Sequence, residues 1–218
     1  MNVARFALSL CAVLTLGRDA LAESEAKVAI PPFDDKYSRF VKRLEAGETE
    51  INYTEFRNSF LESEQFKISA GQKPDLKTLR TTLHELMKKS DYPEVIEVTT
   101  KMLTLDYTDM EAHKIRQQTC KMLGDSGCAK KHHDIEFGLL NSIVKKGDGK
   151  SCQTGWPVTQ VEEEYFILAM LGAKLRRQSI DNTGGLCDKM EVESPEGRAT
   201  YYFEVSKVFE RYKKSGIK

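Results

Sequence analysis

The sequence lacks a charge excess, and beyond its first 22 residues it lacks long apolar runs. Lys and Arg number 33, as do Asp and Glu, so the formal net charge is zero. Balanced charge argues against a protein whose main partner is a nucleic acid or an anionic membrane surface. No later stretch approaches the ~18 uncharged apolar residues of a membrane-spanning helix. We therefore expect a soluble mature chain with no nucleic-acid partner.

Short catalytic and cofactor-binding motifs are also missing. No Gly-x-Ser-x-Gly sequence marks a nucleophilic serine. Residues 147–151 read Gly-Asp-Gly-Lys-Ser, but a P-loop needs a glycine where Val144 stands and a preceding strand, whereas a helix is predicted there. The acidic repeat of a calcium loop is absent around Asp148. The sequence thus predicts no cofactor.

The glycine loop itself has two interpretations. Gly147 and Gly149 permit positive φ, so Lys150 and Ser151 beside them are candidates for meeting an anion, and Asp148 for meeting a cation. The favoured interpretation is a turn that ends a helical array, in which the glycines serve backbone geometry.

The first 22 residues stand apart from the rest of the chain. Arg5 precedes an 11-residue apolar run from Phe6 to Leu16, and Ala20-Leu21-Ala22 is a small-x-small cleavage site. This pattern is typical of a secretory signal peptide, and the run is too short to span a membrane. We expect cleavage after Ala22 and a periplasmic or secreted protein.

Cysteine usage is sparse. With Cys11 in the leader, four cysteines remain, and an even number in an exported protein favours disulfides. Of the three possible connectivities we predict Cys120–Cys128, across the turn between adjacent helices, and Cys152–Cys187, across the C-terminal part. Four buried free thiols are the alternative.

Apolar periodicity predicts a helical region over residues 34–145, after a flexible lead-in at 23–33. Helices are expected at 34–45, after Thr54, and as four consecutive elements from Asp75 to Lys145, with a loop at 69–74. Ser90-Asp91 and Gly124-Asp125 lie 34 residues apart at the turns of two matching halves. This is the tetratricopeptide spacing, so we predict two helical hairpins of that type.

The period changes after residue 145, where a small α+β region is expected over 146–218. Alternation at Val158 and Val161 predicts a strand, and residues 162–171 a helix. Two strands at 189–193 and 200–205 are joined by a Ser-Pro-Glu-Gly hairpin turn, and a short helix ends the chain. The expected fold is mainly α, with the hairpins capped by a short antiparallel sheet.

Several short motifs occur together after the helical hairpins: Gly-Asp-Gly-Lys-Ser at 147–151, the following Trp-Pro-Val, Glu-Glu-Tyr at 163–165, and Gln178-Ser179. In this combination the chain resembles a family of secreted bacterial proteins known only as a domain of unknown function. The resemblance covers roughly Tyr37 to Val205. It implies an exported bacterial protein with a repeat-like helical region, and it implies no activity.

These features favour a non-catalytic interaction protein. Its partner would be a peptide segment or an envelope protein, held in the groove of the helices at 76–89 and 109–123. The groove candidates are polar residues off the apolar stripes: Arg80, His84, Lys114, Arg116 and Gln117.

Two alternatives remain open. A hydrolase would use His132 or His133 with Glu163 and the loop at 147–151, which requires these groups to converge in space. A small-ligand or metal carrier would use His132 with Glu136, one helical turn apart, and His113. Adjacent histidines point about 100° apart on a helix and cannot easily bind one ion, so no metal site is predicted.

Three successive acids, Glu162 to Glu164, begin a predicted helix and interact favourably with its dipole. At least one is expected to face inward beside Tyr165. Burial would raise the pKa of that carboxyl and suit it to acid–base chemistry.

Overall fold

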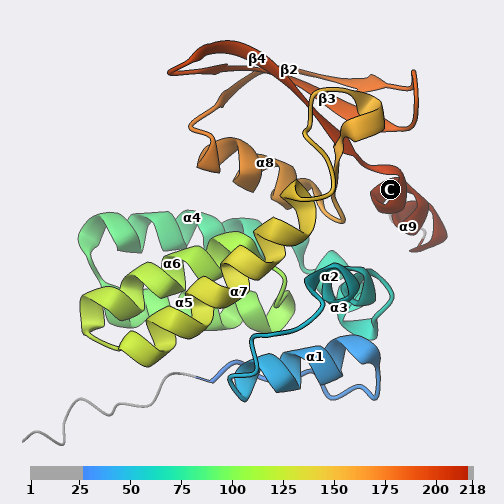
Figure 1. Ribbon diagram of the computed structural model, residues 1–218. Helices are drawn as coiled ribbons and strands as arrows, with labels where there is room; N and C mark the ends of the chain where they lie inside the picture. Colours follow the sequence, from blue (N-terminus) through green and yellow to red (C-terminus); the bar gives the residue numbers. More distant parts are fainter. Residues whose placement is uncertain (1–26, 216–218) are drawn as a thin grey trace, which may run out of the picture.

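The computed structural model describes residues 27–215 (Figure 1). The predicted signal peptide, and residues 23–26 of the predicted lead-in, lie outside the described residues. Residues 27–35 contain no helix or strand, and the Val28 side chain is buried in the core. The part of the lead-in that is described is therefore attached to the core through Val28.

The described residues form nine α-helices, one 3₁₀ turn and four strands. In chain order they are α1 (Lys36–Glu45), α2 (Tyr53–Leu61), α3 (Glu64–Gly71), α4 (Lys73–Lys89), α5 (Tyr92–Leu105), α6 (Met110–Leu123), α7 (Ser126–Val144), η1 (Cys152–Thr154), β1 (Trp156–Pro157), α8 (Val161–Met170), β2 (Lys174–Asp181), β3 (Cys187–Ser194), β4 (Gly197–Glu204) and α9 (Ser206–Ser215). The prediction of a mainly helical chain with a small C-terminal sheet is confirmed.

Helices α4 to α7 pack each on the next, and their turns repeat. Ser90 ends α4 with φ 57°, and Gly124 ends α6 with φ 79°, both in the left-handed region. An Asp follows each of them and precedes the next helix, and the Asp125 side chain accepts a hydrogen bond from Cys128 N. Corresponding turns thus lie 34 residues apart in the structure as in the sequence.

The sheet has the order β1-β4-β3-β2. β2, β3 and β4 are antiparallel, whereas β1 pairs in parallel with β4, with Trp156 opposite Phe203. The sheet is therefore mixed. The chain enters it from the helical region through β1, which runs beside β4 in the same direction. The hairpin turn predicted at Ser194 to Gly197 joins β3 and β4 as expected.

Two local predictions are wrong. Val158 and Val161 do not form a strand, because Gln160 and Glu163 form a capping box that starts α8 at Val161. The loop predicted at 69–74 is mostly helical, since α3 runs to Gly71 and α4 begins at Lys73. β2 was not predicted at all, because its polar sequence shows no apolar alternation.

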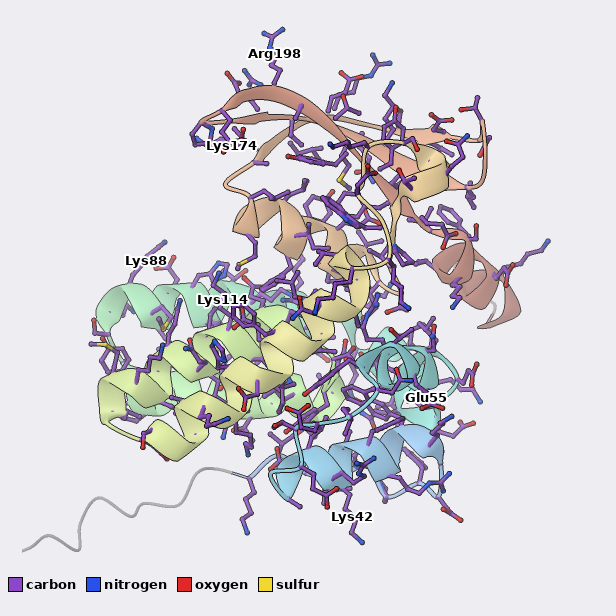
Figure 2. All side chains as sticks on the ribbon, in the orientation of Figure 1. Lys42, Glu55, Lys88, Lys114, Lys174 and Arg198 are labelled. Carbon is purple, nitrogen blue, oxygen red and sulfur yellow. A yellow bond between two sulfur atoms is a disulfide. The ribbon has the colours of Figure 1, made fainter. Side chains whose placement is uncertain are left out.

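Helix α8 lies between the sheet and the helical region (Figure 1). One hydrophobic cluster continues through both, from Tyr37 and Phe56 to Phe166 and Phe203. Charged side chains such as Lys42 and Arg198 point outward at opposite ends of the molecule (Figure 2). No helix among residues 27–215 has the length and apolar character to cross a membrane.

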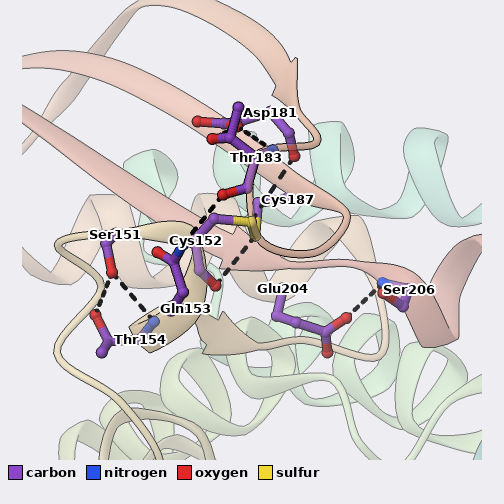
Figure 3. Close-up of a disulfide and its surroundings, with 9 residues drawn as sticks. All are labelled: Ser151, Cys152, Gln153, Thr154, Asp181, Thr183, Cys187, Glu204 and Ser206. Atoms are coloured by element: carbon purple, nitrogen blue, oxygen red, sulfur yellow. Dashed lines mark hydrogen bonds between the residues drawn. A yellow bond between two sulfur atoms is a disulfide. The ribbon is translucent and has the colours of Figure 1, made fainter.

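Both predicted disulfides are confirmed. Cys120–Cys128 joins the end of α6 to the start of α7. Cys152–Cys187 joins η1 to the first residue of β3 (Figure 3). Beside it, Gln153 Nε2 donates a hydrogen bond to the Thr183 carbonyl at 3.1 Å, so the loop before β3 is held at two points.

Candidate functional site

A cleft of about 790 Å³ opens between α4, the start of α6 and α8. Its walls carry both charges and apolar side chains. The lining residues are Lys73, Leu76, Lys77 and Arg80 from α4; Asp106, Thr108, Asp109, Met110 and Glu111 around the start of α6; and Gln160, Glu162, Glu163, Tyr165, Phe166 and Ala169 from α8 and its cap. Helices distant in sequence thus build one concave surface.

Arg80 links two walls of the cleft. Its Nη2 lies 2.5 Å from Asp109 Oδ2 and its Nη1 lies 2.5 Å from Glu111 Oε2. His84, one turn further along α4, has Nε2 at 2.8 Å from Glu111 Oε1. The guanidinium and the imidazole therefore fix α4 against the start of α6.

Asp106 is a buried acid of the cleft lining. Its Oδ1 accepts hydrogen bonds from Thr108 N at 2.8 Å and Thr108 Oγ1 at 2.6 Å, and its Oδ2 accepts one from Gln160 Nε2 at 2.8 Å. Burial, helped by the nearby Asp109 charge, raises the pKa of Asp106 to about 7. This carboxyl can exchange a proton near neutral pH, and Gln160 ties it to the start of α8.

The predicted groove residues separate into two groups. Arg80 and His84 lie at or beside the cleft, and Lys114 reaches α8, with Nζ 5.6 Å from the Phe166 ring centroid (Figure 2). Arg116 and Gln117 are only 1% and 7% exposed. They do not belong to the open surface, because α6 packs between α5 and α7 and buries polar residues beside its apolar stripe.

His113 and His132 form a buried pair, and both are 0% exposed. Their Nδ1 atoms lie 2.8 Å apart, and His113 Nε2 lies 3.0 Å from the Tyr107 carbonyl. A carbonyl only accepts, so His113 carries its proton on Nε2 and accepts at Nδ1 from His132. Burial and the neighbouring His132 hold the pKa of His113 well below its ordinary value, so this histidine is neutral.

His133 lies elsewhere on α7. It is exposed, stacks on Phe137 with ring centroids 4.5 Å apart, and its Nδ1 lies 3.4 Å from Asp134 Oδ1. His132 and His133 thus have different surroundings, as expected for adjacent residues of a helix. Within residues 27–215 no group of three or more His, Cys, Asp or Glu side chains is arranged to hold a metal ion.

Glu163 forms a buried ion pair with Arg57 of α2, and both side chains are 3% exposed. Arg57 Nε donates to Oε1 at 2.7 Å and Nη2 to Oε2 at 2.6 Å, while Thr159 N and Oγ1 also donate to the carboxylate. Arg57 Nη2 donates further to the Pro157 carbonyl. These bonds join α2 to α8, and none of the hydrogen bonds described here brings Glu163 to either histidine.

The glycine loop packs on Trp156. A Cβ at Gly147 would lie 2.2 Å from the Thr154 carbonyl oxygen, and one at Gly149 would lie 2.9 Å from the Trp156 ring. Trp156 Nε1 donates to the Gly147 carbonyl at 3.0 Å, and Asp148 Oδ1 accepts from Lys150 N and Thr154 Oγ1. The glycines, Asp148 and the following tryptophan therefore form one structural turn.

Sequence reasoning missed Asp106 and Gln160, which line the cleft. The Asp-x-Thr pattern at 106–108 is a common turn signal, and Gln160 with Glu163 is a capping-box pattern. Neither pattern indicates burial, which depends on the packing of α8 against α6.

Comparisons with known proteins identify a family. A family model described as "Domain of unknown function (DUF4919)" matches residues 27–214. No curated protein and no solved structure matches the chain.

Proposed function

The chain belongs to the DUF4919 family, and we propose that it is a non-catalytic binding protein whose cleft between α4, α6 and α8 holds a peptide segment of another exported protein. The observation that carries this proposal is the cleft itself. A volume of about 790 Å³ accommodates several side chains, in the range of ordinary ligand sites.

The chemistry of the walls suits a peptide. Exposed Lys77 of α4 and exposed Glu162 of α8 offer opposite charges, while half-buried Leu76 and exposed Ala169 offer apolar contacts. A peptide segment presents both charges, apolar side chains and backbone polar groups, so it matches this mixed lining better than a purely apolar or purely anionic ligand does.

The hairpin arrangement supports the same site. α4 and α6 are the first helices of the two predicted tetratricopeptide-type hairpins, and both contribute to the cleft. The two disulfides agree with export, because disulfides persist in oxidising compartments. An exported protein would meet its partner in the envelope or outside the cell.

The test uses a large side chain that fills the cleft and removes no hydrogen bond or ion pair. A peptide selected from a display library on the wild-type protein is titrated into Ala169→Trp, because Ala169 is exposed and lines the cleft. We expect affinity to fall at least about tenfold, which corresponds to about 1.4 kcal/mol. Ala46→Trp, outside the cleft, is the control and keeps wild-type affinity. Unchanged binding by Ala169→Trp places the peptide site elsewhere.

A further inference from the structure

Helix α8 buries a second acid on the side that faces the sheet. Glu164 is 0% exposed, and Asp188 of β3 is 5% exposed. The two carboxyl groups are within side-chain hydrogen-bonding contact. Every second residue of β3 from position 188 to 192 is buried, namely Asp188, Met190 and Val192. All three therefore point to the sheet face that packs on the core.

The hydrogen bonds around this pair are incomplete. Gln178 Nε2 donates to Asp188 Oδ2 at 2.7 Å, and Tyr165 Oη donates to Gln178 Oε1 at 3.2 Å. No N–H or O–H group of the described residues donates to either oxygen of Glu164 or to Asp188 Oδ1. Two ionised carboxylates have no hydrogen to share, so their contact requires a proton on one of them.

The charges nearby do not neutralise the pair. The groups that act most strongly on Glu164 are Asp188 from β3 and Glu163 and Glu162 from its own helix, and all are acidic. Burial, followed by the effect of Asp188, raises the pKa of Glu164 to about 9. The Tyr165 phenol is a further titratable neighbour, and burial together with the charges of Glu164 and Asp188 raises its pKa.

We propose that Glu164 and Asp188 share one proton and act as a pH-dependent lock that holds α8 against the sheet. With the proton present, the Glu164 hydroxyl donates to Asp188 and the helix lies on β3. Loss of the proton at alkaline pH leaves two carboxylates in contact in a buried setting, and their repulsion releases α8 from β3. Because α8 also lines the cleft, release alters the cleft, and this consequence alone rests on the proposed function.

A divalent cation fits the pair less well than a proton. Ca²⁺ takes about six to eight oxygen ligands and Mg²⁺ needs an octahedral set, usually with several waters. Among residues 27–215, two carboxylates and the amide of Gln178 converge here with no third acidic, His or Cys ligand, and both acids are closed off from solvent. These oxygen atoms therefore suit one shared proton better than a divalent cation.

The proton is tested directly by carbon-13 NMR of side-chain carboxyls in the wild-type protein. The Glu164 resonance is assigned by its loss in Glu164→Gln. We expect it to titrate with a midpoint several pH units above the ordinary Glu value of about 4.3. A midpoint in the ordinary range overturns the proposal.

The lock is tested by amide hydrogen exchange of residues 161–170, with wild type and Glu164→Gln compared at the same pH so that intrinsic exchange chemistry cancels. Gln keeps the shape and a donor but cannot ionise. We expect the exchange rate of wild type relative to Glu164→Gln to rise at least about tenfold from pH 6 to pH 10, because each pH unit in which only the released state is ionised changes this ratio tenfold. Glu162→Gln, on the exposed side of the same helix, is the matched control and follows wild type.

Two outcomes would overturn the lock. In the first, Glu164→Gln exchanges faster than wild type at both pH values, which identifies a packing role with no proton. Alternatively, CaCl₂ or MgCl₂ raises the melting temperature of wild type but leaves Glu164→Gln unchanged, which identifies a cation site. Asp188→Asn provides the second variant: the lock requires it to remove the alkaline change as Glu164→Gln does.

Discussion

The two sides of α8 compensate buried acids in opposite ways. Glu163 faces the helical region and meets the guanidinium of Arg57, whereas Glu164 faces the sheet and meets another acid, Asp188. The two residues are adjacent, 3% and 0% exposed, and about 100° apart on the helix. A guanidinium keeps its charge at any pH a protein meets, whereas the shared proton is lost as pH rises through about 9. The helical side is therefore a permanent connection and the sheet side a titratable one.

Breaking the permanent connection is expected to have the largest effect. Arg57→Ala leaves the Glu163 carboxylate buried without its cation, and we expect a loss of about 3–5 kcal/mol in unfolding free energy. Urea denaturation monitored by the fluorescence of the single tryptophan measures it. The double variant Arg57→Met/Glu163→Met, which leaves no buried charge, should lose much less. Equal losses would show that the ion pair is not the source of the effect.

The next largest effect is expected from removing a disulfide, and the helical region and the C-terminal region contain one each. Removing Cys152–Cys187, whose cysteines are 35 residues apart, frees a longer loop than removing Cys120–Cys128, whose cysteines are 8 apart. Loop entropy predicts costs of about 4 and about 2.5 kcal/mol, respectively. Paired Cys→Ser variants are compared in the same urea experiment. A larger loss at Cys120–Cys128 would contradict an entropic origin.

The two regions should also lose stability over different pH ranges. Asp106 has a pKa of about 7 when folded and about 3.9 when unfolded, so the native state holds the extra proton between these values. Its contribution is complete below pH about 4 and decreases as pH rises to about 7, by on the order of 4 kcal/mol, whereas the decrease due to Glu164 continues to about 9. Asp106→Asn should flatten only the lower range, as urea midpoints measured from pH 4 to 10 would show. An unchanged lower range would exclude Asp106 as its source.

The smallest effect is expected at an exposed pair that resembles Arg57–Glu163 only in residue type. Arg39 Nη1 lies 2.9 Å from Asp34 Oδ1, with side chains 63% and 100% exposed. Solvent and salt screen such a pair. Arg39→Ala should therefore leave the urea midpoint unchanged, and a clear shift would show that burial is not what separates the two pairs.

Local pattern was sufficient for much of the fold. The stripes of apolar residues, the turns at Ser90 and Gly124 and the β3–β4 hairpin depend on neighbours in sequence, so they were predictable. The cysteine pairing was predictable because few connectivities exist for four cysteines. β2 pairs with the neighbouring β3 but was missed because its polar sequence shows no apolar alternation. The parallel pairing of β1 was not predicted because it depends on β4, a strand far away in the chain.

The candidate site was less predictable for the same reason. Arg80 lines the cleft, but Arg116, chosen by the same rule, is buried against α5. Helical periodicity gives the direction of a side chain relative to its own helix. It does not say which neighbouring helix covers that direction.

The sequence by itself determined the helical hairpins, the disulfides and the position of three acids at the start of α8, because these follow from spacing along the chain. Only the tertiary structure decided what each acid meets. Packing brought Arg57 of α2 to Glu163 and Asp188 of β3 to Glu164, and it placed α8 over α4 and α6 to form the cleft. The partner of a buried charge comes from distant parts of the chain, and that partner determines whether the charge is held or titrates.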